Sequence, residues 1–326
     1  MKALITGGTG FVGRYLIEHL TQLGYEIAVV NRASSSALPG FKNVQQHLIE
    51  LADESLMQKF INKYQPEHIY HLAGFSSVRD SWDSKKEAFQ SNVMDTLSFF
   101  EVIRKSSVAQ KVRVLTVGSS EEYGRVTDLM KPIVENTKRN PISPYGISKA
   151  TTQMLAKQYY ESYGINVIHA RPFNHIGPRQ RLGFVATDFA KQIAEIEVNL
   201  RPPALRVGNL MAERDFSDVR DIVTAYEMLL RLGESGQTYN VCSGVPTAIK
   251  SILEYYTFYS IRKDITIEVD QALFRPIDVP SYVGDPQKLR NQTGWENRIA
   301  LQDSLKDVLN YWRGEIRATE GYFSNV

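Results

Sequence analysis

Cysteine is almost missing from this chain of 326 residues, which contains only Cys242. A single cysteine excludes an internal disulfide framework and a zinc site built from several cysteines. No metal site is therefore expected. Cys242 ends an apolar run that begins at Tyr239, so we interpret it as a small buried hydrophobic residue of a strand.

Long apolar runs and blocks of one charge are also absent. No stretch reaches the roughly 18 apolar residues that a membrane helix requires, so no membrane contact is expected. The 38 basic and 36 acidic residues leave a net charge of +2 without a long basic run, which argues against a nucleic-acid partner. The apolar run after Lys2 stops at Gly7 and continues as a glycine-rich loop. This indicates a folded first strand rather than a signal peptide, and a cytoplasmic protein is expected.

The first half of the chain alternates short apolar runs with amphipathic segments, a pattern typical of a parallel sheet flanked by helices. It predicts an α/β, Rossmann-type, doubly wound parallel sheet over residues 1–172. Strands are predicted at residues 2–5, 26–30, 47–49, 68–72, 112–117 and 165–170. Helices are predicted at residues 11–23, 53–63, 81–106 and from Ser143, where Ser143 and Pro144 provide a cap and a first turn.

The pattern loosens after Pro172 and predicts a smaller C-terminal α/β region that binds substrate, mainly over residues 173–313. Some of its later segments are expected to return to the first domain. Helices are predicted at residues 184–197, 219–232, 249–259 and 301–312, and strands at residues 205–207, 238–241 and 265–269. The tail at 314–326 is polar and is expected to be poorly ordered.

A glycine loop with the spacing GxxGxxG follows the first strand and opens the first helix. Its glycines are Gly7, Gly10 and Gly13, with Phe11 and Val12 at the start of the helix. Glycine lets the backbone turn tightly and approach a pyrophosphate, whose negative charge is favoured at a helix N-terminus. The loop therefore predicts a dinucleotide site.

The end of the second strand indicates which dinucleotide binds. Asn31 and Arg32 stand where an acidic residue would accept hydrogen bonds from an adenosine 2′-hydroxyl. The guanidinium of Arg32 suits a 2′-phosphate instead, and Ser34 and Ser35 add hydroxyl donors, so NADP(H) is favoured over NAD(H). Further residues expected near the cofactor follow the third and fourth strands: Glu50, Leu51, Leu72, Ala73 and Gly74.

Tyr145 and Lys149 are four residues apart on a predicted helix and so lie on one face of it. The ammonium is expected to lower the pKa of the phenol from its reference value of roughly 10, so that the tyrosine can exchange a proton near neutral pH. Ser119 follows the fifth strand at the carboxyl edge of the sheet, where open α/β sheets bind ligands. Together they predict proton transfer coupled to hydride transfer at a carbonyl. Tyr145 and Lys149 are also expected to bind the cofactor, with Lys149 contacting the nicotinamide ribose.

These motifs resemble the extended short-chain dehydrogenases/reductases, a family of nucleotide-sugar epimerases, dehydratases and reductases. The similar segments cover nearly the whole chain: GGTGFVG at residue 7, HLAG at 71, SSEEYG at 119, YGISK at 145 and RPFN at 171. The resemblance implies that Ser119, Tyr145 and Lys149 are catalytic and that Asn92 supports the structure or the cofactor. It also implies a homodimer formed by pairing the helices at 81–106 and 143–163 into a four-helix bundle, although Phe89, Val93, Leu97 and Phe100 could equally form intrachain core.

The segments RPFNHIGPRQ at residue 171, VGNL at 207 and RDFSDVRD at 214 are similar to the GDP-mannose branch of that family. A GDP-sugar is thus the implied substrate, and its two phosphates need cationic partners. The residues expected to contact it are Ser120, Asn174, Arg179, Lys191, Arg206, Arg214 and Arg275.

Two reactions remain open within this branch. A 4,6-dehydratase acting on GDP-mannose recycles its cofactor and needs a base for the C5 proton, a position that the resemblance assigns to Glu121. A reductase consumes NADPH to reduce the C4 ketone of GDP-4-keto-6-deoxy-D-mannose to GDP-D-rhamnose. The reductase is favoured by three features that differ from the dehydratases: the serine at 119, the GGTGFVG loop, and a chain shorter than theirs. An alternative of another class is a non-catalytic NADP-binding regulator.

Overall fold

The computed structural model describes residues 1–32, 38, 40–41, 44–126, 131–274 and 279–323. Its main element is a seven-stranded sheet in the order β10-β6-β5-β4-β1-β2-β3, in which every neighbouring pair is parallel. The strands are β1 (Lys2–Thr6), β2 (Glu26–Asn31), β3 (Val44–Leu48), β4 (His68–His71), β5 (Arg113–Val117), β6 (Asn166–Pro172) and β10 (Thr238–Val241). This confirms the predicted Rossmann-type α/β fold.

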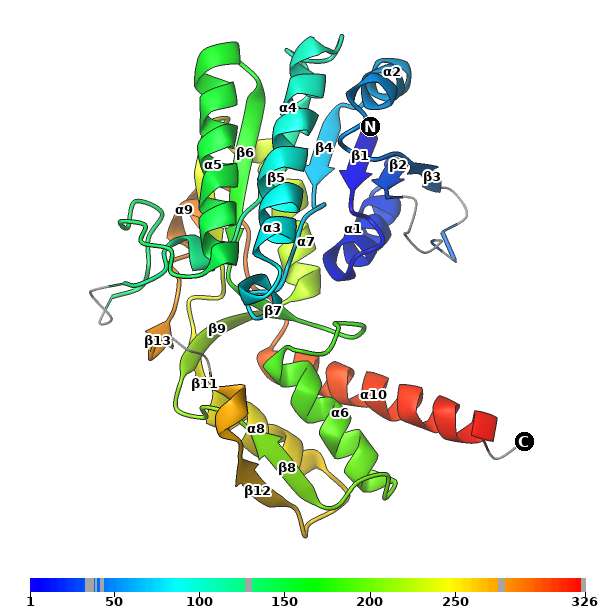
Figure 1. The fold of residues 1–326 in the computed structure, drawn as a ribbon, viewed down its shortest axis with the longest axis vertical. Coiled ribbons are helices and arrows are strands. Elements are labelled where there is room, and N and C mark those ends of the chain that lie inside the picture. Colours follow the sequence, from blue (N-terminus) through cyan, green and yellow to red (C-terminus); the bar gives the residue numbers. More distant parts are fainter. Residues whose placement is uncertain (33–37, 39, 42–43, 127–130, 275–278, 324–326) are drawn as a thin grey trace.

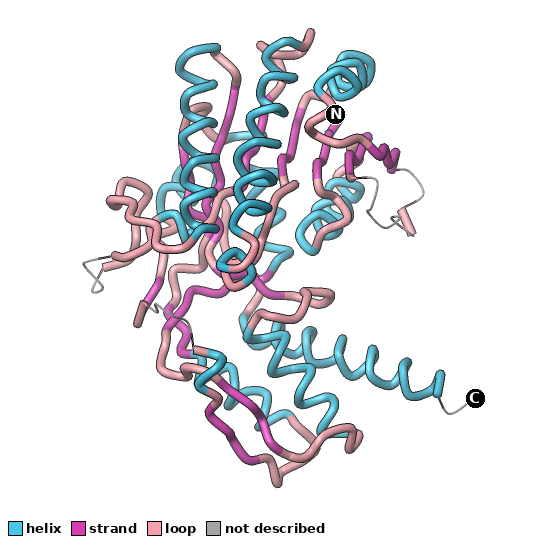
Figure 2. The backbone as a smooth tube through the Cα atoms, viewed as in Figure 1, coloured by secondary structure: helices cyan, strands magenta, loops and turns pink. Residues whose placement is uncertain are grey.

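Helices cover both faces of this sheet (Figures 1 and 2). Because successive strand residues point to opposite faces, Ala3 and Ile5 belong to one buried core and Leu4 to the other. The first core includes side chains of α1 (Phe11–Gln22) and α7 (Val219–Leu232). The second includes side chains of α2 (Glu54–Tyr64), α4 (Asp95–Lys105) and α5 (Pro144–Tyr163).

A smaller lobe stands below the carboxyl edge of the sheet in Figure 1. Its core joins α6 (Val185–Glu197), α8 (Ile249–Tyr259) and α10 (Leu301–Phe323) with the buried side chains of β8 (Ala204–Val207), and the exposed strand β12 (Thr266–Val269) pairs with β8 in parallel. Short strands link the lobe to the sheet: β7 (Asn174–Ile176), β9 (Glu213–Asp218), β11 (Pro246–Ala248) and β13 (Ser281–Tyr282).

Three later elements return to the main sheet. The helix α7 and the short helix α9 (Gln287–Thr293) contact each other, and β10 pairs with β6. The strand predicted at 238–241 thus lies at the edge of the large sheet rather than in the lobe. Cys242 follows it with its side chain fully buried, as the sequence predicts.

The sequence predicts a poorly ordered tail over 314–326, and the structure extends α10 into this tail as far as Phe323. One predicted helix differs in the structure. The helix predicted at 81–106 is divided into a 3₁₀ turn at Asp80–Trp82, α3 (Lys85–Phe89), a π-helical turn at Gln90–Met94 and α4. Such π turns widen a helix locally and often mark functional positions, and this one contains Asn92.

Within the described ranges, no helix is long and apolar enough to cross a bilayer. The same residues contain no group of three or more histidine, cysteine, aspartate or glutamate side chains placed to hold a metal ion.

Candidate active site

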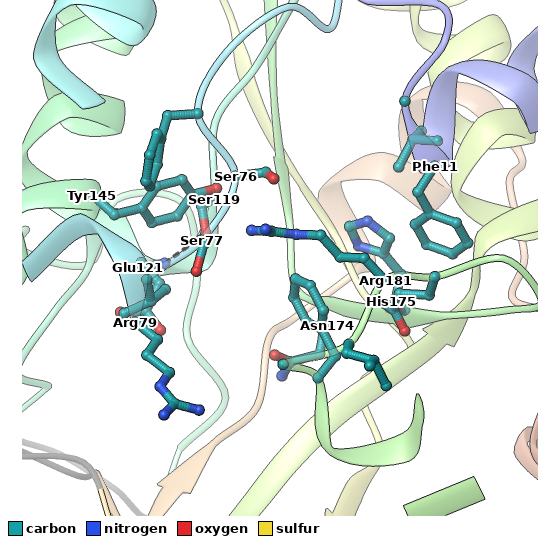
Figure 3. A pocket seen from close by; sticks show the side chains of 18 of the residues that line it. Phe11, Ser76, Ser77, Arg79, Ser119, Glu121, Tyr145, Asn174, His175 and Arg181 are labelled. Carbon is teal, nitrogen blue, oxygen red and sulfur yellow. Dashed lines mark hydrogen bonds between the residues drawn. The ribbon is translucent and has the colours of Figure 1, made fainter. Parts of the chain in front are cut away.

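A cleft of about 1210 Å³ runs between the carboxyl edge of the sheet and the smaller lobe. Pockets for one drug-sized ligand span roughly 300–1,000 Å³, so this cleft has room for more than one such ligand. The glycine loop and the ends of β2, β4 and β5 line one side, and the segment from Pro172 into α6 lines the other. Figure 3 shows Ser119, Glu121 and Tyr145 facing Asn174 and His175 across it.

The glycine loop forms the part of the cleft next to α1. Gly7 has a φ of 73°, and a Cβ there would lie 2.7 Å from the backbone nitrogen of Ala73. A Cβ on Gly13 would lie 2.6 Å from the Cα of Gly8 and 2.7 Å from the oxygen of Gly7. The loop is therefore packed against its own backbone, and it presents the N-terminus of α1 to the cleft, a favourable position for a phosphate.

Asn31 ends β2 beside this loop and is 4% exposed. Its Oδ1 accepts a hydrogen bond from the backbone nitrogen of Thr9 at 3.4 Å. Its buried Nδ2 has no partner among the residues that the structure describes. An orphaned buried donor in a cleft fits a ligand that brings an acceptor, as a phosphate does. Arg32 also lines the cleft, whereas Ser34 and Ser35 fall outside the described residues.

The other predicted cofactor contacts lie along the same wall. Each of them lines the cleft: Gly7, Gly10, Phe11, Val12, Gly13, Glu50, Leu51, Leu72, Ala73 and Gly74. The sequence prediction thus selected positions that are far apart in the chain and come together at the edge of the sheet.

Ser119, Tyr145 and Lys149 all face the cleft. Ser119 caps the 3₁₀ turn Ser120–Glu122, and its hydroxyl accepts a hydrogen bond from the Glu121 amide at 3.2 Å. Ser143 caps α5 by accepting from the Gly146 amide, and Pro144 starts the helix, as predicted. The Nζ of Lys149 donates to the Val117 carbonyl at 2.9 Å and lies 5.8 Å from the centre of the Tyr145 ring.

The expected lowering of the Tyr145 pKa is wrong for this structure. Burial raises the pKa of the phenol well above its ordinary value, a hydrogen bond with Ser119 opposes this, and the charges of Glu121 and Glu122 raise it further. Burial lowers the pKa of Lys149 to about 8, against the opposing effect of Glu122. Desolvation of both side chains thus dominates, and Tyr145 holds its proton at neutral pH.

Asn92 connects the π-helical turn to the cleft wall. Its Oδ1 accepts from the Phe75 amide at 2.8 Å, and its Nδ2 donates to the Ser148 hydroxyl at 2.9 Å. It is buried, and a Cβ on Gly74 would lie 2.5 Å from its Oδ1. Asn92 therefore positions the loop after β4 against α5.

The predicted substrate residues are gathered on the lobe side, except for Ser120, which follows β5. Asn174, Arg179, Lys191, Arg206 and Arg214 line the cleft with Ser120. Several are already paired: Arg179 with Glu18 at 3.2 Å, Lys191 with Glu195, and Arg206 with Asp270. Arg214 donates to the carbonyls of Glu213 and Val279 at 2.7 and 2.8 Å. Arg275 lies outside the described residues.

Three cleft arginines were missed by the sequence prediction. Arg79, Arg181 and Arg201 line the cleft; Arg181 pairs with Asp80 and Arg201 with Glu195, each at 3.3 Å. In Figure 3 the Arg181 side chain extends from the lobe side toward the loop of Ser76 and Ser77. Arg181 directly follows the RPFNHIGPRQ segment, so the sequence offered proximity as a signal. Arg79 carried no comparable signal.

The sequence prediction also missed a buried charge cluster behind the turn that follows β5 and leads into Ser120–Glu122. Glu122 is fully buried and contacts His169 and Arg171, which both come from β6. The sequence shows two adjacent glutamates after Ser120, and nothing local distinguishes the one that faces the cleft from the one that faces inward. Only the pairing of distant strand residues separates them.

Comparison with known proteins adds the chemical context of these motifs. Residues 4–308 match the family model described as GDP-mannose 4,6 dehydratase. A GDP-6-deoxy-D-mannose reductase of Pseudomonas aeruginosa is 30% identical over 316 residues, covering 97% of this chain and 98% of that protein. A GDP-mannose 4,6-dehydratase of Yersinia enterocolitica is 28% identical, covering 94% of this chain and 92% of that protein.

Solved structures show the same fold. The structure of RMD from Pseudomonas aeruginosa complexed with NADPH is 29% identical and superposes with a TM-score of 0.82, over 96% of this chain and 99% of that one. A UDP-glucose 4-epimerase from Thermotoga maritima, 24% identical, superposes with a TM-score of 0.87 over 97% of this chain and all of that one. The second similarity concerns the fold alone.

Proposed function

The chain belongs to the GDP-mannose 4,6-dehydratase family, and we propose that it reduces the C4 ketone of GDP-4-keto-6-deoxy-D-mannose with NADPH, giving GDP-D-rhamnose. The observation that carries this proposal is the state of Tyr145, a buried cleft tyrosine whose pKa is raised, with a hydrogen bond to Ser119. A phenol that keeps its proton is suited to act as a general acid. Reduction of a ketone needs such an acid at the developing alkoxide.

The proposed roles divide between the two sides of the cleft. Bound NADPH would supply a hydride to the C4 carbon, leaving NADP⁺. Tyr145 donates its proton to the C4 oxygen, and Ser119 hydrogen-bonds that oxygen while the charge develops. Cations from both sides of the cleft, Arg79 after β4 and Arg181 and Lys191 on the lobe side among them, would hold the diphosphate of the GDP-sugar. The large sheet would then hold NADPH and the lobe the sugar nucleotide.

The direct test is incubation of the purified protein with the 4-keto sugar nucleotide and NADPH. Loss of the nicotinamide absorbance in proportion to ketone consumed, together with an NMR spectrum of the product showing a reduced C4, would support the proposal. Absence of NADPH oxidation over a range of enzyme and substrate concentrations would refute it.

Asn31 is expected to select NADPH over NADH. Its Oδ1 accepts from Thr9 and its Nδ2 is an orphaned donor, so Asn31→Asp keeps the shape and the acceptor but replaces the donor with a negative charge. Repulsion of the 2′-phosphate should weaken NADPH binding by about 10- to 100-fold, as expected for a charge-assisted contact of roughly 1.5–3 kcal/mol. NADH binding should be unchanged or tighter. Fluorescence titration with both cofactors measures this preference, and equal weakening of both would contradict it.

Dehydration of GDP-mannose is the second candidate, and the observation that favours it is the place of Glu121. This carboxylate lines the cleft next to Ser119, and its charge acts on Tyr145. The family resemblance assigns the base for the C5 proton to this position. In that case GDP-mannose alone would yield a 4-keto product without net cofactor consumption.

Glu121→Gln distinguishes the two activities. The amide cannot take a proton from C5, so any formation of 4-keto sugar from GDP-mannose should fall by about 10²- to 10⁴-fold. Reduction of the supplied ketone should be retained, because its proton comes from Tyr145. NMR of the sugar products with and without NADPH reads both reactions. Parallel loss of both would mean that Glu121 holds the substrate rather than acting as a base.

A homodimer through α4 and α5 is part of the proposal. Met94, which ends the π-helical turn before α4, is 49% exposed, and Ile147 and Met154 of α5 are 42% and 60% exposed. Phe100, in contrast, is buried within the chain and stacks on Tyr159. The exposed apolar side chains support pairing of this face with a second copy, as in a four-helix bundle. A cytoplasmic location is proposed for the same enzyme.

A further inference from the structure

Glu122 is the centre of a buried charge cluster directly behind the catalytic turn. Its Oε1 accepts hydrogen bonds from the Ser119 amide at 3.0 Å and from His169 Nε2 at 2.9 Å. Its Oε2 accepts from Arg171 Nε at 2.9 Å. Both Glu122 and Arg171 are at most 2% exposed. All of these donors favour the carboxylate form.

The cluster stays ionised although it is buried. Burial opposes the charge of Glu122, but the neighbouring His169 and Arg171 and hydrogen bonds from His169 and the Ser119 amide lower its pKa to about 2. Burial lowers the pKa of His169, so the imidazole is neutral at pH 7. With Nε2–H directed to Glu122, its Nδ1 accepts from the Thr116 hydroxyl at 2.8 Å. The cluster is therefore an anion paired with Arg171 and fixed by a neutral histidine.

The catalytic turn after β5 is held between this cluster and Lys149. The Val117 carbonyl accepts from Lys149 Nζ at 2.9 Å, and the Ser119 amide donates to Glu122 at 3.0 Å. Between them, a Cβ on Gly118 would lie 1.9 Å from Glu122 Oε1 and 2.3 Å from His169 Nε2. Three consecutive residues are thus contacted by an ammonium at one end and a carboxylate at the other, with no room for a side chain between.

We infer that Glu122 is a positioning residue, which holds the turn at Ser119 in place through the Ser119 amide and puts a negative charge behind the turn that Lys149 contacts at Val117. This deepens the proposed reduction and rests on it for its kinetic consequence. Glu122 itself lies behind the backbone and touches neither substrate nor cofactor in this arrangement.

Among the groups around Lys149, Glu122 is the main charge that favours the protonated form of the lysine. Tyr145 shares its helix, His71 approaches from β4, and His169 from β6. Burial together with the Lys149 charge lowers the pKa of His71 to about 3, so His71 and His169 are both neutral. Among the described residues, Glu122 is the charge that raises the pKa of Lys149. Glu121 faces the cleft on the Tyr145 side.

Glu122→Gln removes the charge and keeps an oxygen for the Ser119 amide. Because Glu122 raises the pKa of both Lys149 and Tyr145, the variant should lower both values. Reduction requires a charged lysine and a protonated tyrosine, forms that are lost as pH rises. The alkaline limb of kcat should therefore move to lower pH, by about one unit. At neutral pH, kcat should fall by about 10- to 100-fold, with little change in KM.

A direct titration of Lys149 keeps this test independent of the proposed function. Protein labelled with ¹³C-lysine reports each ε-carbon by NMR, and Lys149→Arg identifies the resonance. The midpoint for Lys149 should move down by about one pH unit in Glu122→Gln. The control is Glu227→Gln, the same change at another buried glutamate, which receives hydrogen bonds from Tyr25 and Arg231 and lies outside the cleft. It should leave the Lys149 midpoint unchanged.

Glu122→Gln leaves the buried Arg171 cation unpaired, so the double variant Glu122→Gln/Arg171→Met is made in parallel. Replacing a whole buried pair by neutral groups is tolerated better than removing one partner, and the Lys149 midpoint should fall in the same way. A midpoint equal to wild type in either folded variant, or failure of both to fold, overturns the inference and makes the cluster structural. If the midpoint shifts while the wild type oxidises no NADPH with the ketone, the positioning role stands and the proposed function fails.

Discussion

Replacing Tyr145 with phenylalanine should lower kcat for ketone reduction by about 10²- to 10⁴-fold, the usual contribution of a positioned general acid. The phenol is buried in the cleft with a raised pKa and a hydrogen bond to Ser119. Phenylalanine keeps the ring and the backbone hydrogen bond to Ser81. NADPH affinity and stability should therefore be nearly unchanged. The rate of NADPH oxidation measures the loss, and fluorescence titration measures the affinity.

Tyr256→Phe is the matched control for that variant. Tyr256 is fully buried in the core of the smaller lobe, and its hydroxyl has no partner in the described part of the chain. Removing an unpaired buried hydroxyl should leave turnover unchanged and stability equal or higher. Wild-type turnover by Tyr145→Phe would refute its role as the acid. Unchanged cellular function of that variant would favour the alternative of a non-catalytic NADP-binding regulator.

Gly13→Ala should weaken NADPH binding by about 10- to 100-fold. The added Cβ would lie 2.6 Å from the Cα of Gly8 and 2.7 Å from the oxygen of Gly7. Both are backbone atoms, so the loop must shift away from the helix N-terminus to relieve the contact. Overpacking of this kind costs about 1–3 kcal/mol, which corresponds to that range of affinity when the strained loop is also the binding site. Calorimetric titration with NADPH measures the change.

Gly314→Ala makes the same chemical change where nothing lies within 4 Å of the new Cβ, on the helix α10. Because alanine favours a helix over glycine by about 0.5–1 kcal/mol, Tm should be equal or slightly higher. NADPH affinity should not change. Tight NADPH binding by folded Gly13→Ala would show that the loop is not the cofactor site.

Much of the candidate site followed from local patterns. The four-residue spacing of Tyr145 and Lys149, the glycines after the first strand and the serine after the fifth depend only on helix periodicity and on strand ends. All of these residues line one cleft. The helix at 81–106 and the tail after residue 314 were less well predicted, because a π-helical turn and the continuation of α10 have no strong local signal.

Local sequence patterns predicted the alternation of strands and helices, the glycine loop, and the set of groups that can move a proton. These follow from the spacing of neighbouring residues along the chain. The packing of distant segments decided which glutamate faces the cleft. Glu121 does, whereas Glu122 turns inward, because the partners of Glu122, His169 and Arg171, come from β6, 47 and 49 residues away. This packing likewise decided that burial, rather than Lys149, dominates the pKa of Tyr145. Desolvation depends on everything packed around a group, and no local spacing reports it.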